Sequence, residues 1–201
     1  MLMTSGLSLE IAAAAARWVV EEGMEYGPAK RRAARDVAGR TTRRAELPSN
    51  DEIEAEVRAY LDLFCADTQP VELAALRRVA ALWMQRMCDF RPHLTGAVWR
   101  GTATKLNNVH LQLYCDDSKA AELALIDQGV AFEVGSLSGP RGDNVSVLST
   151  STLCRELSEN VTVHMSVLDH DDLRGALKPD AQGRTERGDL KALRALMETS
   201  P

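Results

Sequence analysis

Cysteine is scarce in this sequence and forms no recognisable motif. Four cysteines are spread over 201 residues, with no CxxC pair and no histidine at ligand spacing: Cys65, Cys88, Cys115 and Cys154. A disulfide framework or a zinc site is therefore not expected, and a reducing, cytoplasmic compartment fits this cysteine usage best.

Long hydrophobic runs are also missing. The longest, "IAAAAA" at residues 11–16, ends at Arg17 and is too short to cross a bilayer. The first ten residues lack a basic segment followed by an apolar run, so we expect no signal peptide and no membrane association. No GxxxxGK[ST] loop is present to bind phosphates, which disfavours an ATP-dependent ligase of the peptidoglycan type.

No excess of positive charge is present either. The 24 Lys and Arg residues against 29 Asp and Glu residues give a net charge of -5, which argues against a protein that coats nucleic acid with its whole surface. The chain is 45% hydrophobic and 26% charged, as is ordinary for a globular protein. Its length suits one large domain or two small ones.

The hydrophobic pattern changes near residue 92. Before it, apolar residues recur with the helical period of about 3.6 residues. Helices are predicted at residues 8–27, 28–39, 47–67 and 70–90. After it, the period is about two, which is typical of strands. Strands are predicted at 109–115, 129–134, 144–150 and 161–169, with a helix at 116–129. The sequence thus predicts an α+β protein, in which a helical region (1–92) packs on a small mixed sheet (93–177). A mobile linker and a final amphipathic helix follow at 178–201.

The stretch "GAVWRGTATKLNNVHLQL" at residues 96–113 resembles the signature of the minimal nucleotidyltransferases of the DNA polymerase beta superfamily. Gly96 and Ala97 stand where that family has Gly-Ser, and Arg100-Gly101 match its Arg-Gly pair. Asn108 and His110 fall where a strand of the family carries two metal-binding aspartates. The resemblance implies a nucleotidyltransferase-type sheet with helices on one face. It also implies a nucleotide- or phosphate-binding segment made of Gly96, Ala97, Arg100, Gly101, Thr102 and Thr104. Glu133 falls near the place of a third carboxylate.

The departures from the signature bear on catalysis. Two carboxylates at i and i+2 share one face of a strand and can hold divalent ions there. The amide of Asn108 and the imidazole of His110 cannot replace them at a magnesium site, because magnesium prefers anionic oxygen. If each lost charge weakens the site by roughly 3 kcal/mol, the two losses lower the affinity about ten-thousandfold. We therefore expect a catalytically impaired protein that binds a nucleotide, or another phosphate, or a protein partner such as a second copy. Arg100, Asn108 and His110 should share one concave surface.

Three alternatives remain open at this stage. In one, the chain is an active nucleotidyl- or AMP-transferring enzyme that uses an NTP and Mg2+, held by Glu133 with Asp116 or Asp117. In another, it is a helical interaction module whose basic arm, Lys30 to Arg44, binds RNA or DNA. In the third, Asn108 and His110 simply lie on the solvated face of a strand, as alternation alone would produce.

Overall fold

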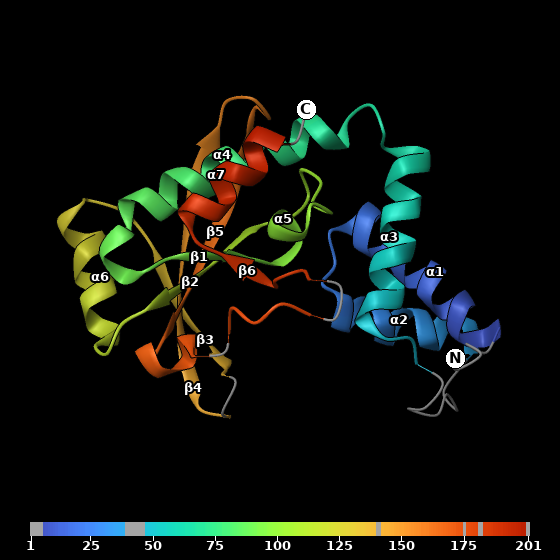
Figure 1. Ribbon diagram of the computed structural model, residues 1–201, viewed down its shortest axis with the longest axis horizontal. Coiled ribbons are helices and arrows are strands. Elements are labelled where there is room, and N and C mark those ends of the chain that lie inside the picture. The colour runs from blue at the N-terminus through green and yellow to red at the C-terminus, as the bar shows by residue number, and fades with distance from the viewer. Residues whose placement is uncertain (1–5, 39–46, 140–141, 175, 181–182, 200–201) are drawn as a thin grey trace. The chain divides into compact units, whose positions relative to one another are not determined.

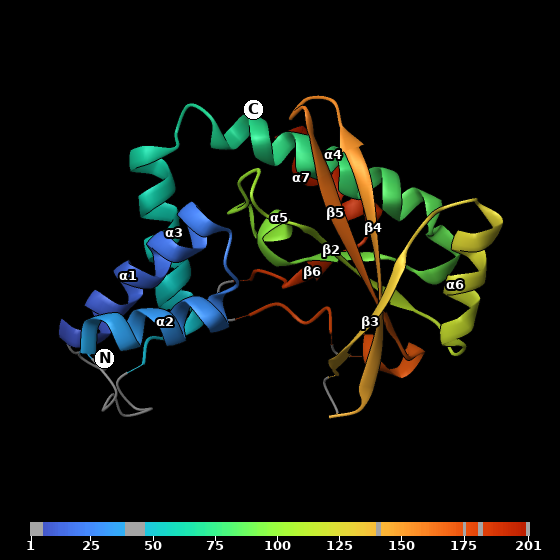
Figure 2. The ribbon, with the colours of Figure 1, turned by 180° about the vertical axis from the view of Figure 1, so that it is seen from behind.

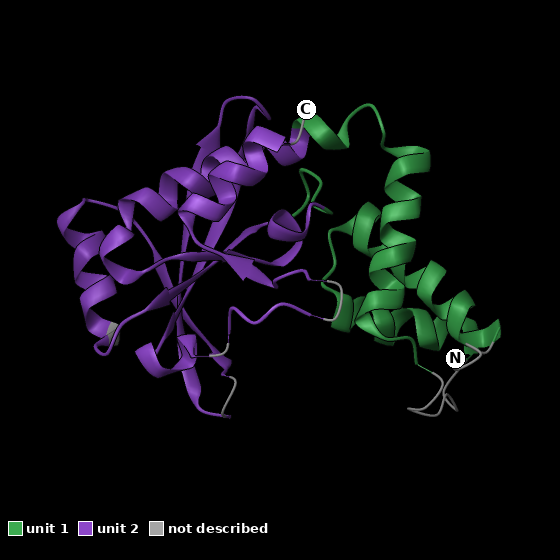
Figure 3. Ribbon diagram, in the orientation of Figure 1, with its two compact units in different colours: residues 1–71, 102–107 green, residues 72–101, 108–201 purple. Residues whose placement is uncertain are grey.

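The protein is described from a computed structural model that covers residues 6–38, 47–139, 142–174, 176–180 and 183–199. It consists of two compact units (Figure 3). Unit 1 comprises residues 1–71 and 102–107, and unit 2 comprises residues 72–101 and 108–201. In the described part of the chain, every helix is too short or too polar to cross a membrane.

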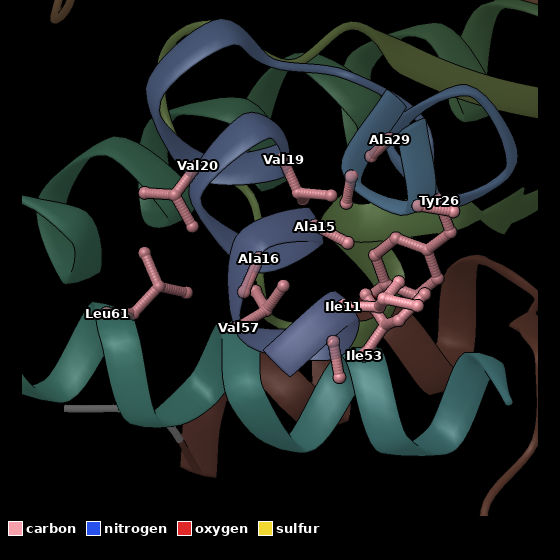
Figure 4. Close-up of a cluster of buried hydrophobic side chains, with 13 residues drawn as sticks. Ile11, Ala15, Ala16, Val19, Val20, Tyr26, Ala29, Ile53, Val57 and Leu61 are labelled. Carbon is pink, nitrogen blue, oxygen red and sulfur yellow. The ribbon is translucent and has the colours of Figure 1, made fainter. Parts of the chain in front are cut away.

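Unit 1 is a helical bundle. Its helices are α1 (Gly6–Glu22), α2 (Tyr26–Ala38) and α3 (Asn50–Phe64). The buried alanines in the middle of α1, Ala12, Ala15 and Ala16, let the other two helices approach closely. Helix α3 contributes Ile53, Val57 and Leu61 to the shared core (Figure 4). A capping box starts α3: the Ser49 side chain accepts from the Glu52 N–H, and the Glu52 carboxylate accepts from the Ser49 N–H.

The loop at residues 102–107 belongs to unit 1, although the sheet surrounds it in sequence. The Gln69 side chain donates to the Ala103 carbonyl over 2.9 Å, and the Asn107 side chain accepts from the Thr104 N–H over 2.8 Å. Gly23 makes room for the loop, because a Cβ at this residue would lie 2.7 Å from the Leu106 carbonyl oxygen. This close approach attaches the loop to the turn after α1.

Unit 2 contains a six-stranded mixed sheet in the order β3-β4-β5-β2-β1-β6. The strands are β1 (His93–Thr95), β2 (Val109–Tyr114), β3 (Glu133–Ser138), β4 (Asn144–Cys154), β5 (Glu159–Leu168) and β6 (Arg187–Gly188). Strands β2 and β5 pair in parallel, and all other neighbours are antiparallel. The helices are α4 (Gln69–Arg86), which begins in unit 1, α5 (Gly96–Arg100), α6 (Ser118–Asp127) and α7 (Leu190–Thr199). Two 3-10 turns, η3 (Cys88–Phe90) and η4 (His170–Leu173), complete the described elements.

One face of this sheet is covered by helices and the other is more open. Helices α4 and α7 lie over one face in Figure 1, whereas β3, β4 and β5 are in front when the molecule is viewed from behind in Figure 2. The indole N–H of Trp83 on α4 donates to the Thr152 hydroxyl of β4 over 2.7 Å. Leu148 and Thr150, which are buried, share a face of β4 with Thr152, so these residues mark the covered face.

The α+β class and the mixed sheet predicted from the sequence are confirmed. The compact units divide differently from the predicted regions. From Glu72 on, α4 belongs with the sheet, to which its Trp83 side chain is hydrogen-bonded, and residues 178–201 belong there too. The predicted phosphate-binding segment at 96–104 begins with the short helix α5. Strand β3 begins at Glu133, four residues later than expected. Gly129 belongs to the turn that follows α6, where its N–H donates to the Ile126 carbonyl, and not to the strand.

The close approach at Gly23 gives a stability prediction. Gly23 and Gly129 both have φ near +65°, but nothing lies within 4 Å of a Cβ at Gly129. In Gly129→Ala we expect only the strain of a left-handed residue, about 1 kcal/mol. In Gly23→Ala we expect about 2–4 kcal/mol, because overpacking adds to that strain. Urea unfolding and amide hydrogen exchange of residues 102–107 measure both. Equal losses in the two variants would mean that the loop does not pack on Gly23.

Candidate functional site

The open face of the sheet in unit 2 carries a band of polar side chains. On β2, Val109, Leu111 and Leu113 are buried on the helix-covered face, while His110 and Gln112 are half-buried on the opposite one. Strand β5 follows the same alternation. Its open-face residues are Thr162, His164 and Ser166. The two-sided design expected for residues 108–114 is therefore present, and parallel pairing extends it across a second strand.

A row of polar side chains crosses the centre of this face. His110 is directly opposite His164 on β5, and His164 is opposite Ser149 on β4. The two imidazole rings stack with centroids 5.1 Å apart. The Asn108 amide nitrogen lies 3.1 Å from His164 Nε2, and the Ser149 hydroxyl lies 2.8 Å from His164 Nδ1. Thr95 on β1 continues the row beyond His110. An amide, two imidazoles and two hydroxyl groups therefore lie in one row on the open face.

Arg187 on β6 supplies a cation to the same face. Its guanidinium donates to Gln112 Oε1 over 2.7 Å and to the Tyr114 hydroxyl over 3.3 Å. Both acceptors lie on the same face of β2 as His110, because they follow it at two-residue intervals. Its side chain is only 19% exposed, and Glu186, at 3.9 Å, is 81% exposed. Sequence reasoning missed Arg187, because it lies in a stretch rich in Gly, Asp and Arg that was read as a mobile linker. Only pairing with β1, which joins Thr95 to Arg187, brings it here.

One end of the open face is closed by apolar packing. Tyr114, Val145 and Leu168 are buried there, and Leu173 of η4 packs against them. His93 meets the Tyr114 ring edge-on, with centroids 5.4 Å apart. The polar row therefore lies beside a rigid apolar cluster that fixes the ends of β2 and β5.

Helix α5 brings part of the predicted phosphate-binding segment next to the polar row. Gly96 begins the helix with φ +75°, and a Cβ at this residue would lie 3.7 Å from Cδ2 of His110. Ala97 and Arg100 are half-buried, and Gly101 ends the helix in the left-handed conformation. The location of Arg100 on the same concave surface as Asn108 and His110 stays a prediction.

The buried Arg77 of α4 holds α5 in place. Its side chain, in a residue that is 5% exposed, donates through Nε to the Val98 carbonyl over 3.3 Å. Burial lowers the pKa of this guanidinium. A carbonyl near the C-terminal end of a helix is a favourable partner for a cation, because these carbonyls lack intrahelical donors. Gly101 lets the Arg77 guanidinium approach, since a Cβ there would lie 3.4 Å from Nη2.

Helix α5 in turn holds the strand that carries Arg187. The Trp99 indole N–H donates to the Thr185 carbonyl over 2.6 Å. The Trp99 ring also lies against Gly188 so closely that any Cβ at that residue would overlap it. A side chain larger than hydrogen at position 188 would therefore displace β6 and Arg187 with it.

The remaining residues of the predicted segment do not lie in this unit. Thr102 and Thr104 belong to unit 1, where both are buried. The segment from Gly96 to Thr104 is thus divided between the two units after Gly101. In unit 2, the residues that accompany the polar row are those of α5.

The carboxylates considered for an active enzyme do not come together. Glu133 is level with His110 in the sheet, but β4 and β5 separate their strands, so about 14 Å lies between them. Asp116 and Asp117 follow the far end of β2, where Asp117 caps α6 and Asp116 lies 3.7 Å from His170. Burial and these two aspartates raise the pKa of the neighbouring Cys115 thiol.

Magnesium does not fit the residues at the centre of the polar face. Asn108, His110 and His164 offer one amide and two imidazoles, where magnesium needs anionic oxygen. Across the residues that the structure describes, no three His, Cys, Asp or Glu side chains are grouped so as to hold a metal ion.

The basic arm proposed for nucleic acid is only partly described. Arg40, Arg43 and Arg44 lie outside the described residues. On α2, the Arg32 guanidinium stacks over the Trp18 ring at 3.5 Å, and Lys30 donates to the Asn50 side chain over 3.2 Å. At least these two cations are therefore engaged within unit 1.

Arg77 and its neighbour Arg78 offer a matched test of the anchor of α5. Arg78 is half-exposed and forms an ion pair with the exposed Glu156 at 3.0 Å. We expect Arg77→Met to lower the free energy of unfolding by about 2–4 kcal/mol, because a buried carbonyl loses its donor. Arg78→Met should change it by at most about 0.5 kcal/mol. Urea unfolding measures both values. Similar small losses in the two variants would show that Arg77 is not the anchor.

Two solved structures resemble this chain over part of its length. The Cid1 poly(U) polymerase bound to MgGTP matches with a TM-score of 0.34 and 14% sequence identity, over 47% of this chain and 32% of that one. A cytoplasmic RNA terminal U-transferase matches with a TM-score of 0.26 and 20% identity, over 59% of this chain and 29% of that one. This chain therefore spans about a third of the length of either structure. Neither a protein-family model nor a curated protein sequence matches it.

Proposed function

We propose that unit 2 is a nucleotidyltransferase-like sheet that binds a nucleotide or a related phosphorylated anion on its polar face, without a magnesium clamp. The observation that carries the proposal is the polar row itself. Asn108 and His110 occupy the two motif positions, and the neighbours across the strands are His164, Ser149 and Thr95. The centre of the row is therefore free of carboxylates that would repel an anion or hold magnesium.

Arg187 strengthens the proposal. It is a half-buried cation whose short contacts are to the neutral Gln112 and Tyr114. A guanidinium in partly desolvated surroundings favours an anionic oxygen over a neutral one, and it recognises phosphate with two parallel hydrogen bonds. Arg100 and the Gly96 backbone are the further donors that the sequence motif suggests.

The proposal implies loss of metal-dependent chemistry. Nucleotidyl transfer needs divalent ions that align the attacking hydroxyl with the departing pyrophosphate. Without carboxylates at positions 108 and 110, those ions have no ligands of the required kind on β2. We therefore infer that this protein binds its phosphorylated ligand and does not turn it over with magnesium.

Isothermal titration calorimetry with ATP and with pyrophosphate, in the presence of EDTA, tests the proposal. We expect binding by the full chain to persist in EDTA and to weaken about tenfold in Arg187→Gln, because one charge-assisted contact is worth about 1.4 kcal/mol. The matched control is Arg184→Gln. Arg184 lies in the same segment but pairs with Asp180 at 3.0 Å, so its loss should leave the affinity within about twofold.

Two further measurements make the result decisive. Thermal unfolding shows whether Arg187→Gln keeps its fold, and Arg100→Ala tests the second predicted cation. Binding that disappears on chelation, or that is equal in wild type, Arg187→Gln and Arg100→Ala, would contradict the proposed site.

A further inference from the structure

Strand β3 is the longer of the two edge strands of the sheet in unit 2. On one side it pairs with β4 through six consecutive residues, and the strand order leaves its other side without a neighbour. Among the residues that the structure describes, no backbone group of β3 bonds to anything beyond β4. All six of its residues are exposed, so its outer N–H and C=O groups are accessible to another strand.

Strand β3 has none of the features that usually protect an exposed edge. Proline, lysine, a bulge or an inward-pointing charge commonly prevents such a strand from pairing with another chain. The sequence EVGSLS contains neither proline nor lysine, and its unbroken register with β4 excludes a bulge. Its one charged residue, Glu133, is the first of the strand. The side chains of Val134 and Leu137 are exposed, to 59% and 43%. This edge therefore favours pairing with a further strand.

The chain itself gives no reason for a glycine at position 135. Gly135 does not have a positive φ, and the nearest atom to a Cβ there would be the Val147 carbonyl oxygen at 3.9 Å. A glycine inside a strand weakens it, and is typical of a place that another backbone approaches or that a facing side chain covers. Gly135 is thus suited to a facing strand from another molecule.

We propose that β3 pairs with β3 of a second copy of this chain, antiparallel about a two-fold axis at Ser136. An axis perpendicular to the sheet reverses the strand and keeps each face continuous, so residues of the same face lie opposite each other. Ser136 then lies opposite the partner's Ser136. Leu137 lies opposite the partner's Gly135 and covers it, and Val134 lies opposite the partner's Ser138.

Charge and side-chain size favour this register over the other one of equal length. An axis at Gly135 would place two glycines opposite each other and Glu133 against the partner's Leu137. The axis at Ser136 leaves both Glu133 carboxylates outside the paired segment, at its opposite ends, so they do not repel each other. The strand is therefore complementary to itself, which is what a two-fold interface requires.

The size of the paired segment sets the strength of the dimer. Five residues from each chain bury less than the roughly 1,200 Å² of a small stable interface, so we expect a weak dimer that forms reversibly. Edge pairing extends the sheet and leaves its polar face accessible. The dimer thus forms independently of any phosphorylated ligand.

Sedimentation velocity of the full chain, over a range of concentrations and in EDTA, measures the self-association. We expect a monomer–dimer equilibrium. Leu137→Lys should weaken dimerisation at least about tenfold, because the two-fold axis repeats the lost apolar contact and the added charge on both sides. The matched control is Leu153→Lys on β4. That side chain is 63% exposed but lies beyond the residues that pair with β3, so the dimerisation constant should stay within about twofold.

A disulfide across the axis tests the register and keeps the test valid even if Leu137→Lys fails to fold. In a Cys88→Ser background, which removes the exposed native thiol, Ser136→Cys should give a cross-linked dimer under mild oxidation. Directly opposite residues have Cα atoms about 4.5–5.5 Å apart, within the range of a disulfide. The matched control, Ser138→Cys, changes the same residue type on the same face of β3. The two copies of residue 138 would lie about 13 Å apart along the strands, so no cross-link should form.

The outcomes separate the dimer from the anion site. A chain that stays monomeric at every concentration, dimerisation that Leu137→Lys leaves unchanged, or equal cross-linking through positions 136 and 138 would overturn the β3 dimer. None of these results would bear on ATP or pyrophosphate binding in EDTA.

Discussion

The parallel pairing of β2 with β5 is the constraint on which the polar face depends. Parallel neighbours place residues of equal register side by side, so Val109, Leu111 and Leu113 join the apolar side chains of β5 on one face. The same register places His110 beside His164 on the other face. A slip of either strand by one residue would turn its imidazole to the helix-covered face and expose its own apolar side chains, which is why the register is strongly determined. The location of the candidate site thus follows from how the core packs.

A second chain of contacts adds Arg187 to that face. The buried Arg77 of α4 holds α5 through the Val98 carbonyl, and Trp99 of α5 packs on Gly188 and bonds the Thr185 carbonyl. Strand β6 is only two residues long, and so few backbone bonds would not hold it against β1 alone. The tryptophan supplies the missing attachment. The packing of α4 and the position of Arg187 are therefore linked through the same helix.

Alternation in the sequence was enough to predict the central strand and its two faces. "VHLQLY" has one apolar and one polar side, and burial of Val109 and Leu111 matches that pattern. The helices of unit 1 were also predictable, because the period of their apolar residues is long and regular. Short elements were not. Helix α5 has five residues, and β6 has two, so neither carries a period that a sequence pattern can reveal.

The neighbours of each strand in the sheet could not be predicted from the sequence either. Glu133 has a suitable place in chain order, but whether it lies near His110 depends on the order of strands in the sheet, and β4 and β5 come between them. His164 had no motif to mark it and reaches the centre of the face only through the pairing of β5 with β2. Arg187 is the same case, because only its long-range pairing with β1 brings it to this face.

We propose that Asn108 and His110 occupy the two strand positions where minimal nucleotidyltransferases carry metal-binding aspartates. The most direct measurement is Mn2+ binding, followed by electron paramagnetic resonance, in the double variant Asn108→Asp/His110→Asp. If the claim is correct, restoring two carboxylates at i and i+2 creates a Mn2+ site at least about a hundredfold tighter than any in the wild type, because each carboxylate adds several kcal/mol. The single variant His110→Asp should lie between them. A folded double variant that binds Mn2+ no better than the wild type would contradict the claim.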